Sequence, residues 1–499
     1  MNNENTFCDF QSVRSQILQD GNQMCEGEFS LPEYAGDISS IISYDITPKI
    51  LSKKQIANKI DLECILEIRV YCLNTDNELF TYEYKYDFIN SIEGINEGDI
   101  VSVNVACDQT VLRQSAERKI YFKAEPDFYI EIYSNRLLKT LLSCEEPTVK
   151  YKKNDYTVFS EYNLYEKNEV YNDIVGLNKP KNDVKTVLRK NTVAFVGDCK
   201  IISKKALIKG EIKNDFIYID VQNNIQKLRT ILPFSYVVDI NEEETDDIKY
   251  FTRCDILSTE ITPNIDDDNT FSSYSIKIKL NLYLSICGKT NAILISDLYS
   301  TVYDTETEKE NIEIITSKDF YKENITIKKD FELPQDVTNI YDAWFSVDSI
   351  KCVDAQDGIK ALGSINLKYL YSTKDEVYSI AEEKTEFEYN NGDANTTNID
   401  CNAIFVPLEC EFSIKGNKLS VKFEGEIIIN NCFKQTVSVV TNSNVLEKNE
   451  NNQSQIIVYY PEENEDLWEI AKRFKADYDE IATNGDDDRS NASSLIIQR

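Results

Sequence analysis

The stretch Gly363-Ser-Ile-Asn-Leu-Lys-Tyr-Leu-Tyr371 alternates apolar and polar side chains. This period of two is typical of a half-buried β-strand. The pattern occurs three times in the chain, and each time a phenylalanine follows the last residue of the stretch by sixteen positions. The three copies, each with its phenylalanine, are residues 64–72 with Phe88, 210–218 with Phe234, and 363–371 with Phe387. Each copy therefore predicts the same β-hairpin.

The segment between the two strands of each hairpin is rich in polar residues that bond to their own backbone and favour turns. The three segments are Asn74–Asn77, Asp220–Asn224 and Ser372–Asp375. A later landmark also recurs, because the cysteines that follow the hairpins stand 147 residues apart, at Cys107, Cys254 and Cys401. A repeat of this length indicates tandem domains, each with its own core.

Hydrophilic junctions at Asn178–Asp183 and Lys318–Asp330 separate the predicted domains. The segment Leu31-Pro-Glu-Tyr34 opens the first domain, and Leu333-Pro-Gln-Asp336 opens the third. The predicted order along the chain is a polar leader over 1–27 with a short helix near 13–18, repeats over 28–176, 183–317 and 331–441, a linker over 442–455, and a small domain over 456–499. Three repeats and a tail agree with a length of 499 residues, and the 30 Tyr and 22 Phe favour strands. We therefore predict a mainly β chain.

Charge and composition exclude several functions. The 54 basic and 86 acidic residues give a formal net charge of −32, which repels phosphate backbones and anionic lipid head groups, so we expect no nucleic-acid binding. The chain contains no histidine, which removes histidine-dependent nucleophiles, general bases and zinc sites. The acidic runs Glu242–Glu244 and Asp266–Asp268 lack the alternating ligands and the glycine of a calcium loop. We expect no catalytic residues, no metal and no cofactor.

The 13 cysteines are an odd number and include no Cys-x-x-Cys pair. The N-terminus lacks the basic and apolar regions of a signal peptide, and no apolar run is long enough to insert into a membrane. We therefore expect a cytosolic chain with reduced thiols, in which Cys107, Cys254 and Cys401 are structural.

The period changes near the C-terminus. Leu467, Ile470, Ala471 and Phe474 fall on one face of a helix, and Asp466 with Glu469 has the spacing of a capping box. Asp477 and Glu480 repeat this spacing for a second helix. Strand-like residues lie before and after the pair, at 456–460 and 495–497. The order strand, helix, helix, strand is therefore predicted for this small domain.

The stretch Asp466-Leu-Trp-Glu-Ile-Ala-Lys-Arg-Phe474 resembles the core of a LysM domain. The Leu31-Pro-Glu-Tyr34 segment and the Tyr- and Phe-rich hairpins resemble SPOCS domains. SPOCS repeats followed by a LysM domain are similar to the arrangement in clostridial spore morphogenetic proteins. The resemblance implies tandem β-sandwich-like SPOCS repeats and a small α/β LysM-like domain. It also implies a non-enzymatic scaffold or adaptor of the spore coat, in the mother-cell cytoplasm at the forespore surface.

In that family the LysM domain contacts the ATPase that forms the coat basement layer. The residues that the resemblance and the helix pattern assign to this contact are Leu467, Trp468, Lys472 and Arg473. Trp468 has two interpretations, since an aromatic residue on this helix also fits the core of the domain. The alternative is an anchor at an interface, where tryptophan is enriched.

Glycan binding is not favoured. The loop Glu463–Asp466 replaces the usual Gly-Asp-Thr, and Asn491–Ser494 replaces a common Pro-Gly-Gln turn. Loss of glycine where a sugar approaches the backbone argues against peptidoglycan. Two alternatives to the adaptor stay open: a self-assembling subunit of a spore layer or appendage, and a peptidoglycan-binding protein. An enzyme that acts on envelope glycans has only the LysM outline in its favour.

Overall fold

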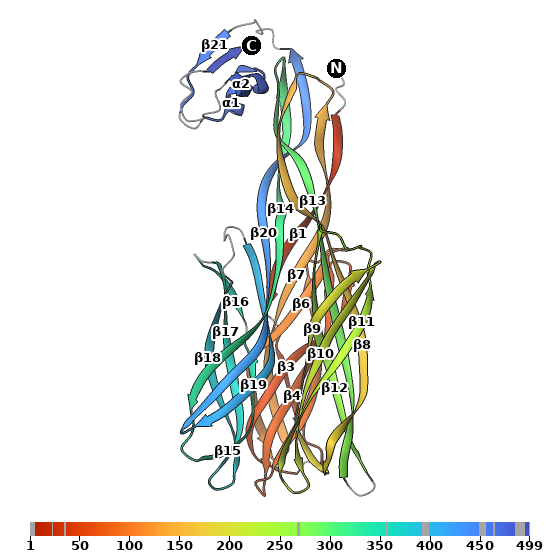
Figure 1. The fold of residues 1–499 in the computed structure, drawn as a ribbon, viewed down its shortest axis with the longest axis vertical. Helices are drawn as coiled ribbons and strands as arrows, with labels where there is room; N and C mark the ends of the chain where they lie inside the picture. The colour runs from red at the N-terminus through yellow and green to blue at the C-terminus, as the bar shows by residue number, and fades with distance from the viewer. Residues whose placement is uncertain are drawn as a thin grey trace.

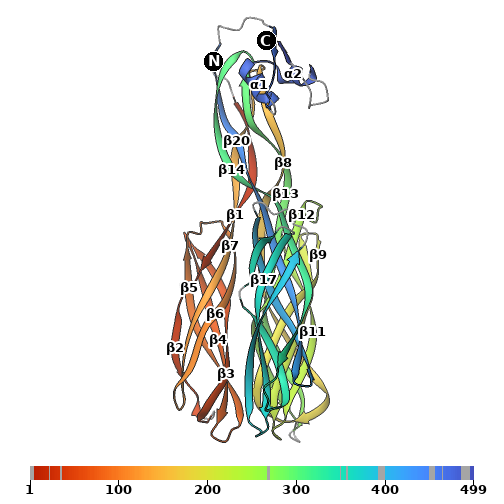
Figure 2. The same ribbon diagram turned by 90° about the vertical axis from the view of Figure 1, so that its left-hand side faces the viewer.

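The computed structural model describes residues 5–21, 23–33, 36–266, 270–348, 350–355, 358–391, 399–448, 456–462, 465–484 and 495–498. The molecule is elongated, with three β-sandwiches side by side and a narrow stalk of long strands above them (Figure 1). A small C-terminal module lies at the tip of the stalk. The view turned by 90° shows the first sandwich on the left and the other two on the right (Figure 2). The predicted mainly β class is confirmed.

Each sandwich has two antiparallel sheets with the same strand order. In the first, β4 lies between β3 and β5, and β7 pairs with β1, β2 and β6. In the second, β10 lies between β9 and β11, and β13 lies between β8 and β12. In the third, β17 pairs with β15, β16 and β18, and β20 lies between β14 and β19.

The strands of the first sandwich are β1 (Asn5–Asp20), β2 (Cys25–Ser30), β3 (Ile38–Ile56), β4 (Lys59–Asn74), β5 (Leu79–Glu93), β6 (Ile100–Ala116) and β7 (Lys119–Cys144). Those of the second are β8 (Val149–Asn182), β9 (Val184–Ile202), β10 (Lys205–Asp220), β11 (Ile225–Asp239), β12 (Ile248–Ile265) and β13 (Thr270–Ser300). Those of the third are β14 (Tyr303–Glu332), β15 (Val337–Val347), β16 (Lys351–Ala355), β17 (Gly358–Thr373), β18 (Tyr378–Asn391), β19 (Ile399–Lys415) and β20 (Lys418–Lys448).

The three predicted hairpins are β4–β5, β10–β11 and β17–β18. In each hairpin, the phenylalanine that follows the last residue of the copy by sixteen positions lies directly opposite the first residue of that copy. Phe88 faces Cys64, Phe234 faces Gly210, and Phe387 faces Gly363. A Cβ added at Gly363 would lie 2.5 Å from a ring carbon of Phe387. The ring therefore covers the backbone of the opposite strand, which requires a very small residue beneath it.

The predicted turns also share one mechanism. The Asn74 side-chain oxygen accepts from the backbone N–H groups of Asp76 and Glu78 at 2.9 and 2.8 Å. Asp220 accepts in the same way from Gln222 and Asn224 at 2.9 and 2.8 Å. In the third turn the Thr373 hydroxyl accepts from the backbone N–H of Val377 at 3.3 Å. These local bonds fix the turns and hence the register of each hairpin.

The first and last strands of each sandwich pair with one another and continue past it as a two-stranded ribbon: β1–β7, β8–β13 and β14–β20. The three ribbons together form the stalk (Figure 1). Its interior is apolar, and all three ribbons contribute to it. One cluster contains Phe10, Val158, Leu294, Ile312, Ile314, Val437 and Val439.

The predicted leader and its helix are wrong. Residues 5–20 form β1, which pairs with β7 from Asn5 opposite Cys144 to Asp20 opposite Phe128. The stretch 13–18 has three apolar residues, Val13, Ile17 and Leu18, too few to distinguish a helix from a strand. Pairing with residues 128–144 of β7 satisfies the backbone of this segment, and Phe10 and Val13 are buried in the stalk.

The predicted junctions are also strands. Lys318–Asp330 lies inside β14, and residues 178–182 belong to β8. Residues 442–448 of the predicted linker continue β20, while 449–455 lie outside the described residues. These segments are polar because one face of each strand is exposed. Consequently the second sandwich begins with β8 and the third begins with β14. Each sandwich therefore begins one strand before its predicted boundary.

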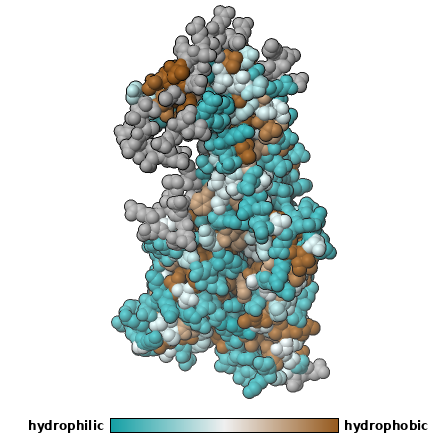
Figure 3. All heavy atoms as spheres, turned by 45° about the horizontal axis from the view of Figure 1, so that its top comes forward, coloured by the Kyte–Doolittle hydropathy of each residue, from teal (hydrophilic) through white to brown (hydrophobic). Residues whose placement is uncertain are grey.

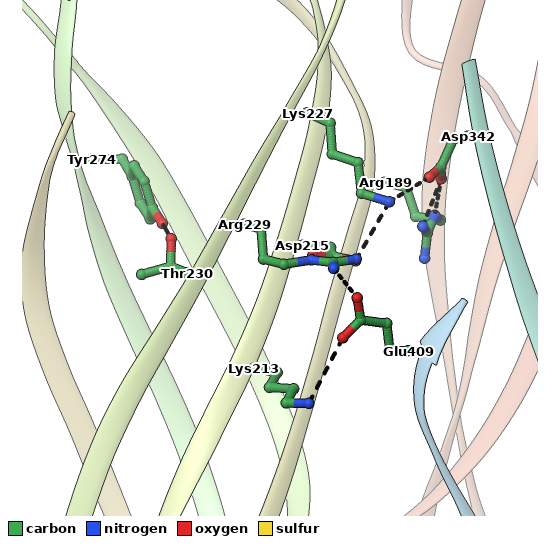
Figure 4. A network of polar contacts seen from close by, with 9 residues as sticks. All are labelled: Arg189, Lys213, Asp215, Lys227, Arg229, Thr230, Tyr274, Asp342 and Glu409. Carbon is green, nitrogen blue, oxygen red and sulfur yellow. Dashed lines mark hydrogen bonds and ion pairs between the residues drawn. The ribbon is translucent and has the colours of Figure 1, made fainter. Parts of the chain in front are cut away.

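Buried charges join the sandwiches to one another. Arg189 of β9 donates from Nη2 to Oδ2 of Asp342 of β15 at 2.6 Å, and these side chains are only 5% and 2% exposed. Lys227 reaches the other oxygen of Asp342 at 2.8 Å, and the Arg189 guanidinium lies 5.0 Å from the Trp344 ring. Figure 4 shows this network between the second and third sandwiches. Because its charges are paired inside the protein, we interpret it as an interdomain contact rather than a ligand site.

A second buried cation lies where the sandwiches meet the stalk. Lys318 of β14 is buried, and its Nζ lies 4.0 Å from the Tyr133 ring centroid and 5.1 Å from that of Tyr162. It also donates a hydrogen bond to the Tyr133 hydroxyl. The lysine thus connects strands of all three ribbons. Together with the Arg189–Asp342 contact, it connects the sandwiches and the stalk, and we call this assembly the body.

Candidate interaction site at the tip of the stalk

The C-terminal module consists of β21 (Ile456–Tyr459), α1 (Leu467–Phe474), α2 (Tyr478–Asn484) and β22 (Leu495–Gln498). The two strands pair antiparallel. This is the predicted order of strand, helix, helix and strand. Helix α1 begins as predicted, because the Asp466 carboxylate accepts from the backbone N–H of Trp468 at 2.9 Å.

Helix α1 packs against the stalk as well as against its own module. Trp468 is 3% exposed, and its ring makes an edge contact with Tyr299 of β13 at 5.0 Å between ring centroids. The Trp468 Nε1 donates to Oδ2 of Asp297 at 2.8 Å, and the Tyr299 hydroxyl donates to the Ala476 carbonyl at 2.7 Å. The core of the module therefore includes a residue of the stalk.

Asp297 is the centre of this contact. Besides Trp468, its carboxylate accepts from Lys472 of α1 at 2.7 and 2.9 Å, and from Lys309 of the stalk at 2.8 Å. Burial raises the pKa of Asp297, but the hydrogen bonds from Lys309, Lys472 and Trp468 outweigh burial and bring its pKa to about 2. Asp297 is therefore a carboxylate at neutral pH and binds the stalk and the module together.

Ion pairs surround this centre. Lys150 of β8 lies 2.6 Å from Asp477 and 3.2 Å from Asp479, and Lys152 lies 2.6 Å from Asp466. On the other side the charges are reversed, since Lys475 of the module pairs with Asp304 of the stalk. These rim pairs are partly exposed and contribute less than the buried centre.

The structure divides the four residues predicted to bind a partner. Trp468 and Lys472 contact the stalk of the same chain, and Leu467 packs against the core of the module. The side chain of Arg473 is 54% exposed and pairs with Glu465 at 2.7 Å. The two interpretations of Trp468 are combined here, because it is both core of the module and the residue at an interface, although that interface is internal.

Sequence reasoning missed Asp297 and Tyr299. Both lie in the apolar stretch Ile293-Leu-Ile-Ser-Asp-Leu-Tyr299 of β13, and the acid within this stretch is the only local signal. Asp297 and Trp468 are 171 residues apart in the chain, so no local pattern connects them.

One face of the module is apolar and exposed. Along β21 and the next residue, Ile456, Val458 and Tyr460 are 72%, 55% and 69% exposed, whereas Ile457 and Tyr459 pack inward. We call these three outward side chains the β21 face. In the space-filling view, apolar side chains gather on the module at the upper left (Figure 3).

Several expectations fall partly outside the described residues. They include most of the two loops compared with glycan-binding LysM domains, as well as Asp267 and Asp268. Within the described part of the chain, no group of three or more Cys, Asp or Glu side chains is arranged to hold a metal ion. No described helix has both the length and the apolar composition to cross a membrane. All thirteen cysteines are free thiols, and Cys107, Cys254 and Cys401 lie on the corresponding strands β6, β12 and β19.

The fold is that of an elongated scaffold of β-sandwiches, with a small α/β module packed against one end. Residues 183–264 match the family model described as SipL, SPOCS domain. The match covers β9, β10, β11 and nearly all of β12 in the second sandwich. It supports the assignment of this chain as a SipL-like SPOCS protein. A SPOCS domain indicates a part in sporulation, and the family is a structural one. No curated protein and no solved structure matches the chain.

Proposed function

We propose that this protein is a non-enzymatic scaffold of spore-coat assembly, and that its LysM-like C-terminal module docks on the ATPase of the coat basement layer. The observation that carries the proposal is the position of this module at the far end of the stalk, on a chain with a SPOCS domain. The first and third sandwiches share the strand order of the second, so we propose that they are SPOCS-type repeats as well. The site of action would be the forespore surface, on the mother-cell side.

The buried contacts within the body support an adaptor. Buried contacts such as Arg189–Asp342 and Lys318 with Tyr133 fix the sandwiches relative to the stalk. The stalk separates the module from the surfaces of the sandwiches, so the two ends can bind different sites. When the sandwiches and the module both bind the same polymerised layer, the second contact forms at a high effective concentration, which raises the overall affinity.

The docking face that we propose is the α1 face: Leu467, Trp468, Lys472 and Arg473. A partner that binds this face competes with Asp297, which already holds Trp468 and Lys472. Weakening the internal contact should therefore strengthen partner binding, while reversing the charge of the face should weaken it.

The experiment measures binding of the full chain to the purified basement-layer ATPase by surface plasmon resonance. Asp297→Ala should bind several-fold more tightly than wild type, and Lys472→Glu with Arg473→Glu should lose binding. Asp239→Ala is the matched control, since that exposed carboxylate belongs to the second sandwich. Circular dichroism checks that each variant is folded. If neither module variant changes the affinity, the α1 face is not the docking face, and the β21 face and the sandwiches become the candidates.

A further inference from the structure

A cleft lies between the first and second sandwiches. Its walls come from β3, β4 and β5 of the first sandwich and from β9 and β12 of the second, and its volume is about 230 Å³. Pockets for drug-sized ligands have volumes of about 300–1,000 Å³, so this cleft suits a smaller molecule. Four cationic side chains line it: Lys49, Arg69, Lys85 and Lys190. We call this cavity the interdomain cleft.

One carboxylate serves two of these cations on the wall formed by the first sandwich. Glu67 of β4 lies 2.7 Å from the Lys49 ammonium group and 3.6 Å from that of Lys85. The single negative charge of Glu67 balances only one of the two lysines. One positive charge therefore remains in excess on this wall.

A second carboxylate is shared between the two walls. Glu83 of β5 accepts from Arg69 of β4 at 2.8 Å and from Lys190 of β9 at 3.3 Å. Since one carboxylate again serves two cations, a second positive charge remains in excess. The third carboxylate of the cleft, Asp45, is balanced by Lys368 of the third sandwich at 2.8 Å. The interdomain cleft therefore carries two positive charges in excess.

This excess charge is partly buried. The side chains of Lys49, Arg69 and Lys190 are only 21%, 20% and 22% exposed. Water and salt screen such charges less than they screen a surface lysine, so leaving them unbalanced costs free energy. The chain as a whole is acidic, but salt screens distant exposed charges over about 8–10 Å. The nearest cations therefore dominate the potential inside the cleft.

We propose that the interdomain cleft binds a small dianion, of the class of hydrogen phosphate and short dicarboxylates. Two negative charges balance the excess, and guanidinium and ammonium groups are common donors to phosphate and carboxylate oxygens. Thr47, Asn191 and Thr259 also line the cleft, and their hydroxyl and amide groups can donate to the same oxygens. Nucleic acid is excluded all the same, because the net charge of −32 repels an extended polyanion.

A dianion in this cleft contacts both sandwiches. Lys49, Arg69 and Lys85 extend from the first sandwich, whereas Lys190 extends from the second. A ligand that binds only when the two sandwiches are in contact stabilises that contact by mass action. The site is independent of the α1 face and of the proposed partner.

The test titrates the full chain by isothermal titration calorimetry at pH 8 and constant ionic strength. The probes are sodium phosphate and sodium succinate in separate arms, with sodium acetate as the monoanion control. We expect saturable binding of one dianion per chain, and acetate should bind at least about tenfold more weakly because it balances only one of the two charges. Saturation by phosphate alone identifies a phosphate site, and saturation by succinate alone identifies a dicarboxylate site.

Two double variants with the same change in net charge locate the site. Lys49→Gln with Lys190→Gln removes one cation from each wall and should weaken dianion binding at least about tenfold. Lys205→Gln with Lys418→Gln removes two lysines that do not line the cleft and are 64% and 57% exposed, so the affinity should stay unchanged. Lys85→Gln changes a side chain that is 54% exposed, and it should lower the affinity without disturbing the fold. Circular dichroism checks that each variant is folded.

Hydrogen exchange gives a second, independent measurement of the position. Saturating phosphate should slow amide exchange in β5 and β9 and leave exchange in α1 unchanged. The proposal is overturned if neither dianion binds, if acetate binds as tightly as the dianions, or if the two double variants lose affinity to the same extent. Slower exchange in α1 but not in β5 and β9 would overturn it as well.

Discussion

The contact between the C-terminal module and the stalk differs in kind from the contacts that join the three sandwiches. Inside the body, Arg189, Asp342 and Lys318 are almost fully buried. At the tip, Asp297 is the buried charge at the centre, while its surroundings are exposed: the Asp479 side chain is 79% exposed and that of Asp304 is 53% exposed.

This difference separates a permanent contact from a reversible one. Removing one member of a buried pair leaves an uncompensated charge in the interior, so the body should respond as a unit. An exposed ion pair exchanges readily with water and salt, so the module should detach while the body stays folded. A partner of the α1 face needs such a releasable contact.

The largest effect is expected for the buried pair of the body. Asp342→Ala leaves Arg189 without its carboxylate, and we expect a loss of about 3–5 kcal/mol in the free energy of unfolding. Urea denaturation followed by circular dichroism measures this loss. The control is Asp239→Ala, which removes an exposed carboxylate and should change stability by less than about 0.5 kcal/mol. Equal effects of the two substitutions would show that the network does not join the sandwiches.

The next effect concerns the centre of the tip contact. Asp297→Asn keeps the shape of the side chain but removes the charge that binds Lys309, Lys472 and Trp468, which should weaken docking of the module by about 2–3 kcal/mol. Hydrogen exchange should then increase in α1 and stay unchanged in β10 and β17. Unchanged exchange in α1 would contradict the role assigned to Asp297.

Acid should release the module by the same route. The pKa of Asp297 is about 2 in the docked state, below its ordinary value of 3.8, so docking favours the carboxylate. The part of this shift that comes from Lys472 and Trp468 of the module stabilises docking by at most about 2 kcal/mol, and it disappears as the pH falls from about 4 to 2, whereas the bond from Lys309 of the stalk remains after release. The pKa values of Asp466 and Asp477 are lowered too, by Lys152 for Asp466 and, against the effect of burial, by Lys150 for Asp477.

Pepsin digestion of the full chain between pH 2 and 4 detects this release as early cleavage in the module. Asp297→Asn should be cleaved early across the whole range, with a weaker dependence on pH. A wild-type module that resists pepsin equally at pH 2 and pH 4 would rule out a docking contribution from Asp297.

The smallest effect is expected at the rim. Lys150→Gln with Lys152→Gln removes exposed ion pairs to Asp477, Asp479 and Asp466, and each pair contributes about 1 kcal/mol or less. Exchange in α1 should increase slightly at low salt, and wild type and variant should converge at 1 M NaCl. A rim variant that releases the module as fully as Asp297→Asn does would show that the rim is the main contact.

The sequence alone determined the local structure. A period of two marked β4, β10 and β17, and a constant spacing marked Phe88, Phe234 and Phe387 on the returning strands, although only the register of the structure shows which residues they face. Asp466 marked the start of α1. These features are predictable because a strand pattern, a turn and a helix cap depend on residues close together in the chain.

Only the tertiary structure decided which distant strands pair and what the module touches. The polar segment Lys318–Asp330 has the composition of a junction, yet it forms part of β14 because β20 supplies its backbone partners. Trp468 has the pattern of a core or interface residue, yet its partners Asp297 and Tyr299 come from a strand about 170 residues earlier. Pairing of distant strands and burial of a charge depend on which surfaces come into contact once the sandwiches have formed. A local sequence pattern does not specify these long-range contacts.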